Sequence, residues 1–151
     1  MTLRLEHACD LTVDLARSHE MGECSTGTRR IIPIVGGSAV GPLLNGDILD
    51  VGADWQTVTT NGVAELDARY AIRTADGAVI EVVSRGIRHA SAEVTARIAA
   101  GEKVDPDAYY MRTAVRLDCG HPDYAWVNRS LFVAKGGKVG WQVLLSVYRV
   151  V

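Results

Sequence analysis

Apolar and polar residues alternate in the stretch LDARYAIRTADGAVIEVVSR (residues 66–85), and a period of two is typical of β-strands. Its middle, residues 75–77, fits a three-residue hairpin loop whose last residue, Gly77, needs a positive φ that glycine adopts without strain. Such a loop places Thr74 opposite Ala78 and so sets the register of the hairpin. Counting outward predicts the cross-strand pairs Ile72 with Ile80, Tyr70 with Val82, Ala68 with Ser84, Ala71 with Glu81, Arg69 with Val83, and Asp67 with Arg85.

The two faces of this hairpin differ in chemistry. One face is mainly apolar and carries the phenol of Tyr70 and the hydroxyl of Ser84, so we expect it to point inward. Small inward residues at Ala64, Ala68 and Gly86 leave either a space filled from elsewhere or a pocket. The Tyr70 hydroxyl then bonds either to a core backbone group or to a ligand, and the sequence favours neither. The other face is charged, and we interpret it as solvated: Glu65, Asp67, Arg69, Arg73, Glu81 and Arg85.

Length and charge limit the class of protein. The 151 residues fit a single domain, residues 1–151, that buries a core without disulfides or metal. A formal net charge of −2 offers no basic surface for nucleic acid. The N-terminus alternates where a secretion signal needs an apolar core, and no apolar run approaches the roughly 18 residues of a membrane span. We therefore expect a cytoplasmic protein without nucleic-acid or membrane partners, whose Cys9, Cys24 and Cys119 are reduced thiols.

Most of the remaining chain predicts short strands. Residues 3–15 alternate and predict a first strand that is broken near Cys9, and the glycine-rich residues 25–55 suit short strands and turns. Only residues 92–100 favour a helix, with Ser91 as N-cap and Gly101 after its end. This pattern predicts an all-β, mainly antiparallel barrel or sandwich. Further strands are expected at residues 63–74, 78–85, 109–117, 126–134 and 140–150.

The sequence lacks the common catalytic and cofactor motifs. It contains no G-x-S-x-G elbow, no G-x-x-x-x-G-K-[ST] loop, and no G-x-G-x-x-G between a strand and a helix. The VGGSAVG segment (residues 35–41) is interpreted as turns, because no helix follows it to hold a phosphate. His7, His19, His89 and His121 lack the paired spacing of a metal-binding barrel. We expect no metal and no cofactor, which leaves acid/base catalysis or binding alone.

Candidate site residues lie near the ends of predicted strands. Asp54 precedes Trp55, which would desolvate the carboxylate and raise its pKa; the alternative is a turn in which Asp54 bonds to its own backbone. His89 follows Gly86, interpreted as a turn, and is the histidine best placed for proton transfer, although an exposed loop position is the commoner case. Trp126 and Asn128 offer a wall and a hydrogen-bonding amide, or else a core aromatic and an amide that satisfies a bend.

Several sequence blocks together resemble the UPF0311 or DUF3237 family of uncharacterised bacterial proteins. The resemblance runs in order through residues 33–55, 62–82, 84–94, 105–118 and 124–136, nearly the whole chain. It implies a single antiparallel β-barrel with one short helix, of general lipocalin or calycin shape, cytosolic and self-associating as a homo-oligomer. The family typically has Asn where this chain has Ser84, and Pro-Gly where it has Val51-Gly52, while its Leu-Asn is here Val127-Asn128.

The resemblance also bears on the candidate residues. One family block centres on Arg112, although periodicity points both Arg112 and Arg116 outward, and we retain Arg112 as a candidate that binds a carboxylate or an enolate-like oxygen. We expect the barrel to hold a small, partly apolar carbonyl-bearing or aromatic molecule, and we prefer an isomerase, lyase or cyclase without cofactor over a passive carrier or sensor. Asp54 would move a proton, Tyr70 and Asn128 would hold an oxygen, and Trp55 and Trp126 would form walls. A third hypothesis is a structural assembly module.

Overall fold

The hairpin formed by β6 (Ala64–Arg73) and β7 (Val79–His89) has the register predicted from its loop. Ile72 pairs with Ile80, Ala68 pairs with Ser84, and Gly77 has a φ of +88°. Strand β7 continues four residues beyond the expected end, so Gly86 is not a turn but a strand residue paired on both sides. A Cβ atom at Gly86 would lie only 2.0 Å from the carbonyl oxygen of Arg112, and the glycine therefore permits the close approach of the neighbouring strand.

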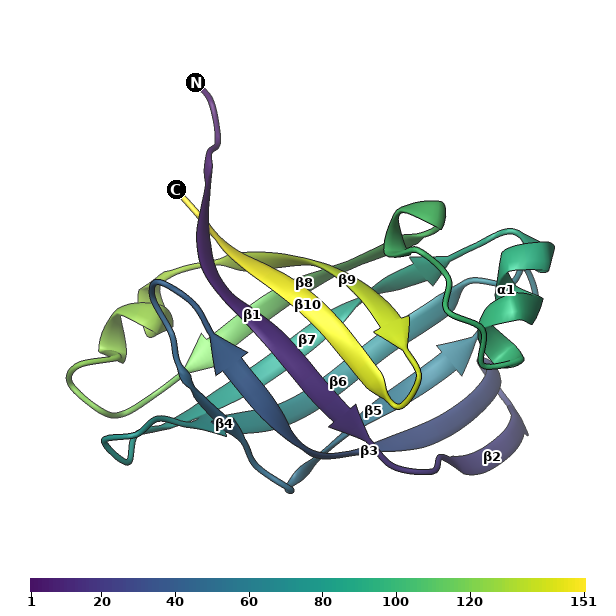
Figure 1. Cartoon of the computed structure of the whole chain (residues 1–151), viewed down its shortest axis with the longest axis horizontal. Coiled ribbons are helices and arrows are strands. Elements are labelled where there is room, and N and C mark those ends of the chain that lie inside the picture. Colours follow the sequence, from purple (N-terminus) through teal and green to yellow (C-terminus); the bar gives the residue numbers. More distant parts are fainter.

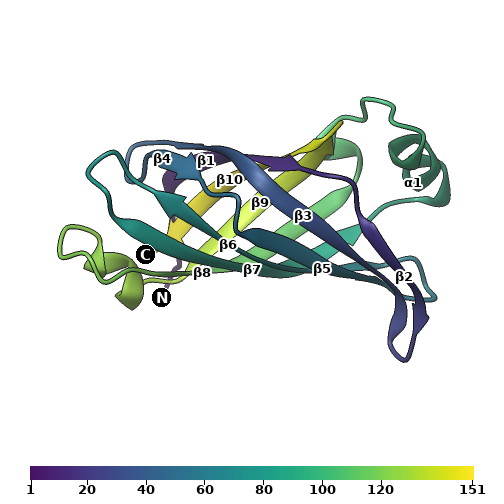
Figure 2. The same cartoon turned by 90° about the horizontal axis from the view of Figure 1, so that it is seen from below.

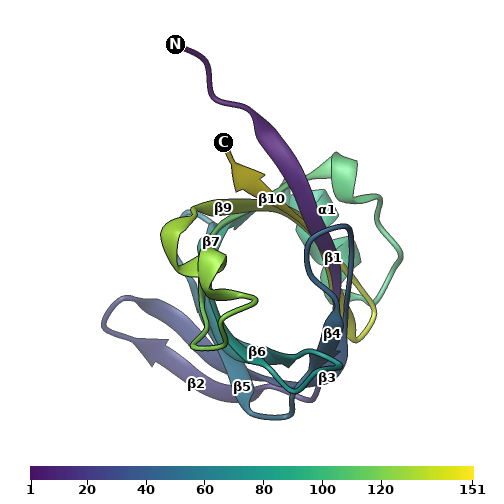
Figure 3. The same cartoon turned by 90° about the vertical axis from the view of Figure 1, so that its left-hand side faces the viewer.

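The strands close into an antiparallel barrel of eight positions, described here for residues 1–151 from a computed structural model. Seen end-on, the ring surrounds a single interior (Figure 3). Strands β4 (Gly46–Ile48) and β5 (Gly52–Val58) share one position between β3 and β6, and β3 returns to β1 and closes the ring. The order around the barrel is β1 (Leu5–Leu15), β10 (Gln142–Val150), β9 (Phe132–Val139), β8 (Tyr110–Asp118), β7, β6, β4 with β5, and β3 (Gly27–Val40).

Two long strands depart from the expected short segments. Strand β1 contains a bulge between His7 and Cys9, where a break was expected. Strand β3 runs through the glycine-rich residues 35–40, so their interpretation as turns is wrong. The register of β3 with β1 shifts next to Gly36, and β3 pairs with β1 along one half and with β5 and β2 (His19–Cys24) along the other. Strand β2 flares away from the ring, as seen from below in Figure 2.

Short helices lie at opposite ends of the barrel (Figure 1). The α-helix α1 (Ala92–Ala99) begins at Ser91, whose hydroxyl accepts the N–H of Val94, as predicted, and a 3₁₀ turn, η1 (Pro106–Ala108), follows it. The 3₁₀ helix η2 (Ala125–Arg129) replaces the first half of the strand expected at residues 126–134, because the N–H of Val127 bonds to the carbonyl of Tyr124. None of the helices is both long and apolar enough to cross a membrane.

The interior is filled at one end and hollow toward the other. Near η2 it is packed by the fully buried side chains of Leu44, Ile72, Ile80, Val82, Val127 and Phe132. Toward α1 the inward positions of the central hairpin carry Ala68, Ser84 and Gly86, as the alternation predicted. The barrel therefore supports a cavity in its α1 half.

Candidate functional site

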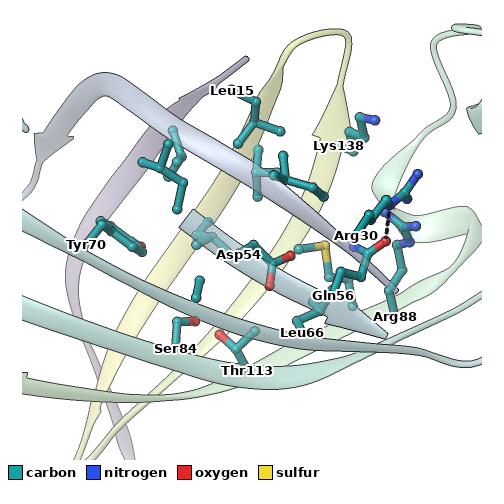
Figure 4. Close-up of a pocket in the computed structure, with 17 residues that line it drawn as sticks. Leu15, Arg30, Asp54, Gln56, Leu66, Tyr70, Ser84, Arg88, Thr113 and Lys138 are labelled. Carbon is teal, nitrogen blue, oxygen red and sulfur yellow. Dashed lines mark hydrogen bonds between the residues drawn. The ribbon is translucent and has the colours of Figure 1, made fainter. Parts of the chain in front are cut away.

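A cavity of about 60 Å³ lies inside the barrel and is lined by inward residues of strands that are distant in sequence (Figure 4). Because one buried water molecule needs about 10–15 Å³, this is room for several water molecules or a small organic group. The apolar part of the lining comes mainly from β1, β3, β6, β8 and β10: Val13, Leu15, Ile32, Ile34, Leu66, Met111, Val143 and Leu145. Ionisable and hydroxyl groups interrupt this apolar wall at particular points.

Three hydroxyl groups face the deeper part of the cavity. Tyr70 retains only 3% of its surface exposed, and neither its hydroxyl nor that of Thr113 bonds to any protein group. Of the two alternatives that the sequence left open for the Tyr70 hydroxyl, the bond to a core backbone group is absent. Ser84, buried beside them on β7, supplies the third hydroxyl. Burial raises the pKa of the Tyr70 phenol, so the group stays protonated and acts as a hydrogen-bond donor.

Asp54 projects into the cavity from β5, between Tyr70 and the basic end (Figure 4). Its Oδ1 accepts the backbone N–H of Asp67 at 2.8 Å, across the strand pair rather than from its own turn. Burial raises the pKa of the carboxyl, and this effect is opposed by the Asp67 N–H, by the positive charge of Arg88 and by Gln56. The carboxyl group therefore retains its proton to a higher pH than an exposed aspartate does.

Three cationic side chains converge where the cavity meets the α1 end of the barrel: Arg30 of β3, Arg88 of β7 and Lys138 of β9. Arg30 donates from Nε to Oε1 of Gln56 at 2.8 Å. Burial and the nearby arginines lower the pKa of Lys138, and burial and Arg30 lower the pKa of Arg88. The same three residues line a second hollow, of about 350 Å³, under α1, which we term the vestibule.

Of the residues predicted from sequence, the structure brings Asp54, Tyr70 and Ser84 together in the cavity. Trp55 lies on the outer face of β5 with 47% of its surface exposed, so the barrel interior rather than Trp55 desolvates Asp54. Arg112 points outward, as its periodicity indicated, and stacks over Tyr110 at 4.9 Å.

His89, Trp126 and Asn128 lie away from this cavity. His89 is exposed at the end of β7. Trp126 packs against Phe132 at the η2 end. The amide of Asn128 donates to the carbonyl and accepts the N–H of Cys119, each at 2.8 Å, which fixes η2 to the end of β8. These contacts explain the positions of Trp126 and Asn128 by packing and backbone hydrogen bonding.

Five polar lining residues were not predicted as site residues: Arg30, Gln56, Arg88, Thr113 and Lys138. Three of them were accessible to the period-two argument, since Thr113 alternates with the outward Arg112 on β8. Gln56 shares a face with Asp54, and Arg88 shares a face with Ser84 once β7 is extended through Gly86. Arg30 had no local signal, because Arg29 and Arg30 differ only in the phase of a strand whose start was unknown. Lys138 had none either, because it lies between the strands expected at residues 126–134 and 140–150.

A separate cluster of possible metal ligands lies outside this cavity. Ligand atoms of Asp76, His121 and Asp123 lie within 4.8 Å of one another, although the sequence has no paired histidine spacing that predicts this cluster. Asp76 belongs to the β6–β7 loop, where its carboxylate accepts hydrogen bonds from Thr74 and, at 3.1 Å, from the hydroxyl of Tyr124. These bonds account for the position of Asp76 as part of the hairpin loop.

Fold and site together define a closed eight-stranded antiparallel barrel with an internal cavity lined by apolar, hydroxyl and ionisable groups. Residues 3–150 match the family described as "Protein of unknown function (DUF3237)", and the chain belongs to this family.

The similar proteins cover nearly the whole chain. The UPF0311 protein RPA1785 of Rhodopseudomonas palustris is 39% identical over 149 residues, which are 99% of this chain and 97% of that protein. Its crystal structure superposes with a TM-score of 0.96 at 38% identity and covers 100% of this chain and 99% of that one. A beta-barrel-like protein of Acinetobacter baumannii AYE is 39% identical, with a TM-score of 0.88 and coverage of 100% and 98%.

A more distant solved structure shares the fold alone. It is described as an enzyme from Penicillium herquei, and it matches with a TM-score of 0.75 at 18% identity, covering 100% of this chain and 96% of that one.

Proposed function

We propose that the cavity binds a small, partly apolar molecule that bears a carbonyl group, and that the protein catalyses a proton transfer next to that carbonyl without a cofactor. One observation carries the proposal: a desolvated carboxyl group, that of Asp54, faces buried hydroxyl groups that no protein group satisfies. Buried polar groups are usually hydrogen-bonded, and exceptions are concentrated at functional sites. The distant barrel called an enzyme is compatible with catalysis in this fold.

The chemistry assigns one role to each group. The phenol of Tyr70 donates a hydrogen bond to the carbonyl oxygen and strengthens that bond as negative charge develops there. The carboxylate of Asp54 takes the proton from the adjacent carbon, and its raised pKa makes it a stronger base than an exposed aspartate. Returning the proton to a different carbon completes an isomerisation. Substrate and product then have the same atoms and the same oxidation state, so the reaction needs no oxidant or metal. Ser84 and Thr113 complete the polar part of the site.

Binding alone is the second candidate function, and a specific observation favours it. Oδ1 of Asp54 already accepts the N–H of Asp67, so the carboxyl group contributes to joining β5 and β6 and is not free on both oxygens. In a carrier or sensor barrel, this bond would hold the Asp54 carboxyl group in place, and its other oxygen would orient the ligand.

Deuterium exchange separates these functions. Phenylacetone carries an aromatic ring and exchangeable protons next to a carbonyl, and ¹H NMR in D₂O follows their loss. The proposal predicts protein-dependent exchange that Asp54→Asn abolishes while the dissociation constant for phenylacetone is retained, and that Tyr70→Phe slows. Binding without exchange would leave the carrier function, and the absence of any binding would contradict both.

A further inference from the structure

The three cations at the junction of cavity and vestibule form no ion pair with a carboxylate of the protein. The ion pairs of the chain all involve other residues. Arg30 bonds to the neutral amide of Gln56, and the side chains of Arg88 and Lys138 donate to no protein group. Clustered like charges are unfavourable in a partly buried site, because each disfavours the charged form of the others.

The surroundings do not neutralise this charge. Asp54 in the cavity and Glu20 in the vestibule are the carboxylates that line the two hollows, against three cations. Thr95, Ile98 and Ala99 of α1 cover the vestibule with mainly apolar surface. The backbone N–H of Lys138 bonds to the hydroxyl of Tyr109 at 2.8 Å, which fixes this part of β9 and therefore the base of the lysine side chain.

We propose that Arg30, Arg88 and Lys138 bind a carboxylate of the ligand, while its carbonyl and apolar part enter the cavity toward Asp54 and Tyr70. The inference rests on the proposed function and narrows it to anionic substrates, such as keto acids or aryl-substituted carboxylic acids. Guanidinium groups suit this role because their planar donors match the two oxygens of a carboxylate. The ligand lies across the junction, with its charged end in the vestibule and its apolar end inside the barrel.

An isosteric pair of compounds tests the charge. In 3-phenylpropionate the charged end is a planar carboxylate, and in 3-phenylpropionamide a neutral, planar amide of similar size replaces it. Isothermal titration calorimetry gives the dissociation constant of each compound. We expect the acid to bind at least about tenfold more tightly than the amide, the ratio that one charge-assisted hydrogen bond provides. Added NaCl should weaken binding of the acid and leave the affinity for the amide unchanged.

Single substitutions then locate the effect. Arg88→Gln and Lys138→Met should reduce the preference for the acid toward one, because each weakens binding of the acid more than binding of the amide. Arg88→Gln should also raise the resistance of the free protein to urea, because it relieves repulsion, and a merely structural arginine would not do so. The control is Arg116→Gln on the outer face of β8, which should alter neither affinity.

The outcomes distinguish the two proposals. Equal binding of acid and amide by the wild-type protein, or an Arg88→Gln variant that loses both equally, would overturn the inference and leave the proposed function standing. Failure of both compounds to bind would count against the cavity as a ligand site, and the proposed function would fail together with the inference.

Discussion

Enlarging Ala68 should stabilise the free protein while weakening ligand binding. Ala68 lies on β6 directly opposite Asp54 and Ser84, and its methyl group lines the cavity. A cavity of about 60 Å³ costs about 1.4 kcal/mol at about 24 cal/mol per Å³. Valine adds two carbon atoms, and burying them is favourable by about 1.6 kcal/mol at about 0.8 kcal/mol each. The two figures agree, so we expect Ala68→Val to gain about 1–1.5 kcal/mol.

The assay is urea denaturation followed by circular dichroism, with a thermal melt as the second measurement. For a chain of this length the gain corresponds to a rise in the melting temperature of roughly 2–6 °C. The matched control is Ala71→Val on the same strand with its side chain on the outer face, which tests strand propensity without filling the cavity. Phenylacetone should bind the Ala68→Val variant more weakly than the wild type and bind the control unchanged.

The sign of the change in stability of Ala68→Val shows whether the α1 half of the barrel is hollow or packed. If the α1 half of the barrel were packed as tightly as the η2 half, two extra carbon atoms would force strain, and Ala68→Val would lose about 1–3 kcal/mol. A destabilised Ala68 variant beside an unaffected Ala71 variant would therefore refute the hollow interior and with it the site.

Three further substitutions test individual groups. Tyr70→Phe should be neutral or stabilising by up to about 1 kcal/mol in urea denaturation, because its hydroxyl bonds to no protein group; a loss of that size would reveal a structural hydrogen bond. Burial raises the pKa of Asp54 in the folded protein above the ordinary value of 3.8, so protonation of Asp54 stabilises the fold at low pH. This contribution is lost as the pH rises from 3.8 through the pKa of the folded state. In urea denaturation across that window, the stability of the wild type should therefore fall relative to that of Asp54→Asn. Asn128→Ala should cost about 1–3 kcal/mol by removing both bonds to Cys119, with phenylacetone affinity unchanged.

Local rules predicted the central hairpin from sequence. The loop fixed the register, and the register decided which side chains of β6 and β7 point inward, so Tyr70 and Ser84 were placed correctly. The helix was predicted equally well, since Ser91 caps it through its own hydroxyl. Both results depend on residues that are close in sequence, and such interactions can be inferred without knowing the rest of the fold.

Longer-range arrangement could not be inferred in the same way. The alternation of Trp126 and Asn128 continued into Phe132, yet the amide of Asn128 bonds to the backbone of Cys119 and favours a 3₁₀ helix over a strand. Likewise, the meeting of Arg30, Arg88 and Lys138 requires the closure of the barrel, because β3, β7 and β9 are not neighbours. The cationic part of the site is thus a property of the ring.

The position of the hollow follows from small side chains that face each other in one layer of the inward side of the central hairpin. Near the loop, Ile72 and Ile80 face each other and fill the barrel with help from Leu44 and Val127. Further from the loop Ala68 faces Ser84, and Gly86 opposite Leu66 has no side chain, so less of the interior is filled there. An eight-stranded barrel is only just wide enough for side chains to fill, so several small residues in one layer open a cavity. Because the register places Asp54 opposite Ala68, the carboxyl group lies beside this gap, and the chain thereby sets an ionisable group where a small molecule has room to approach it.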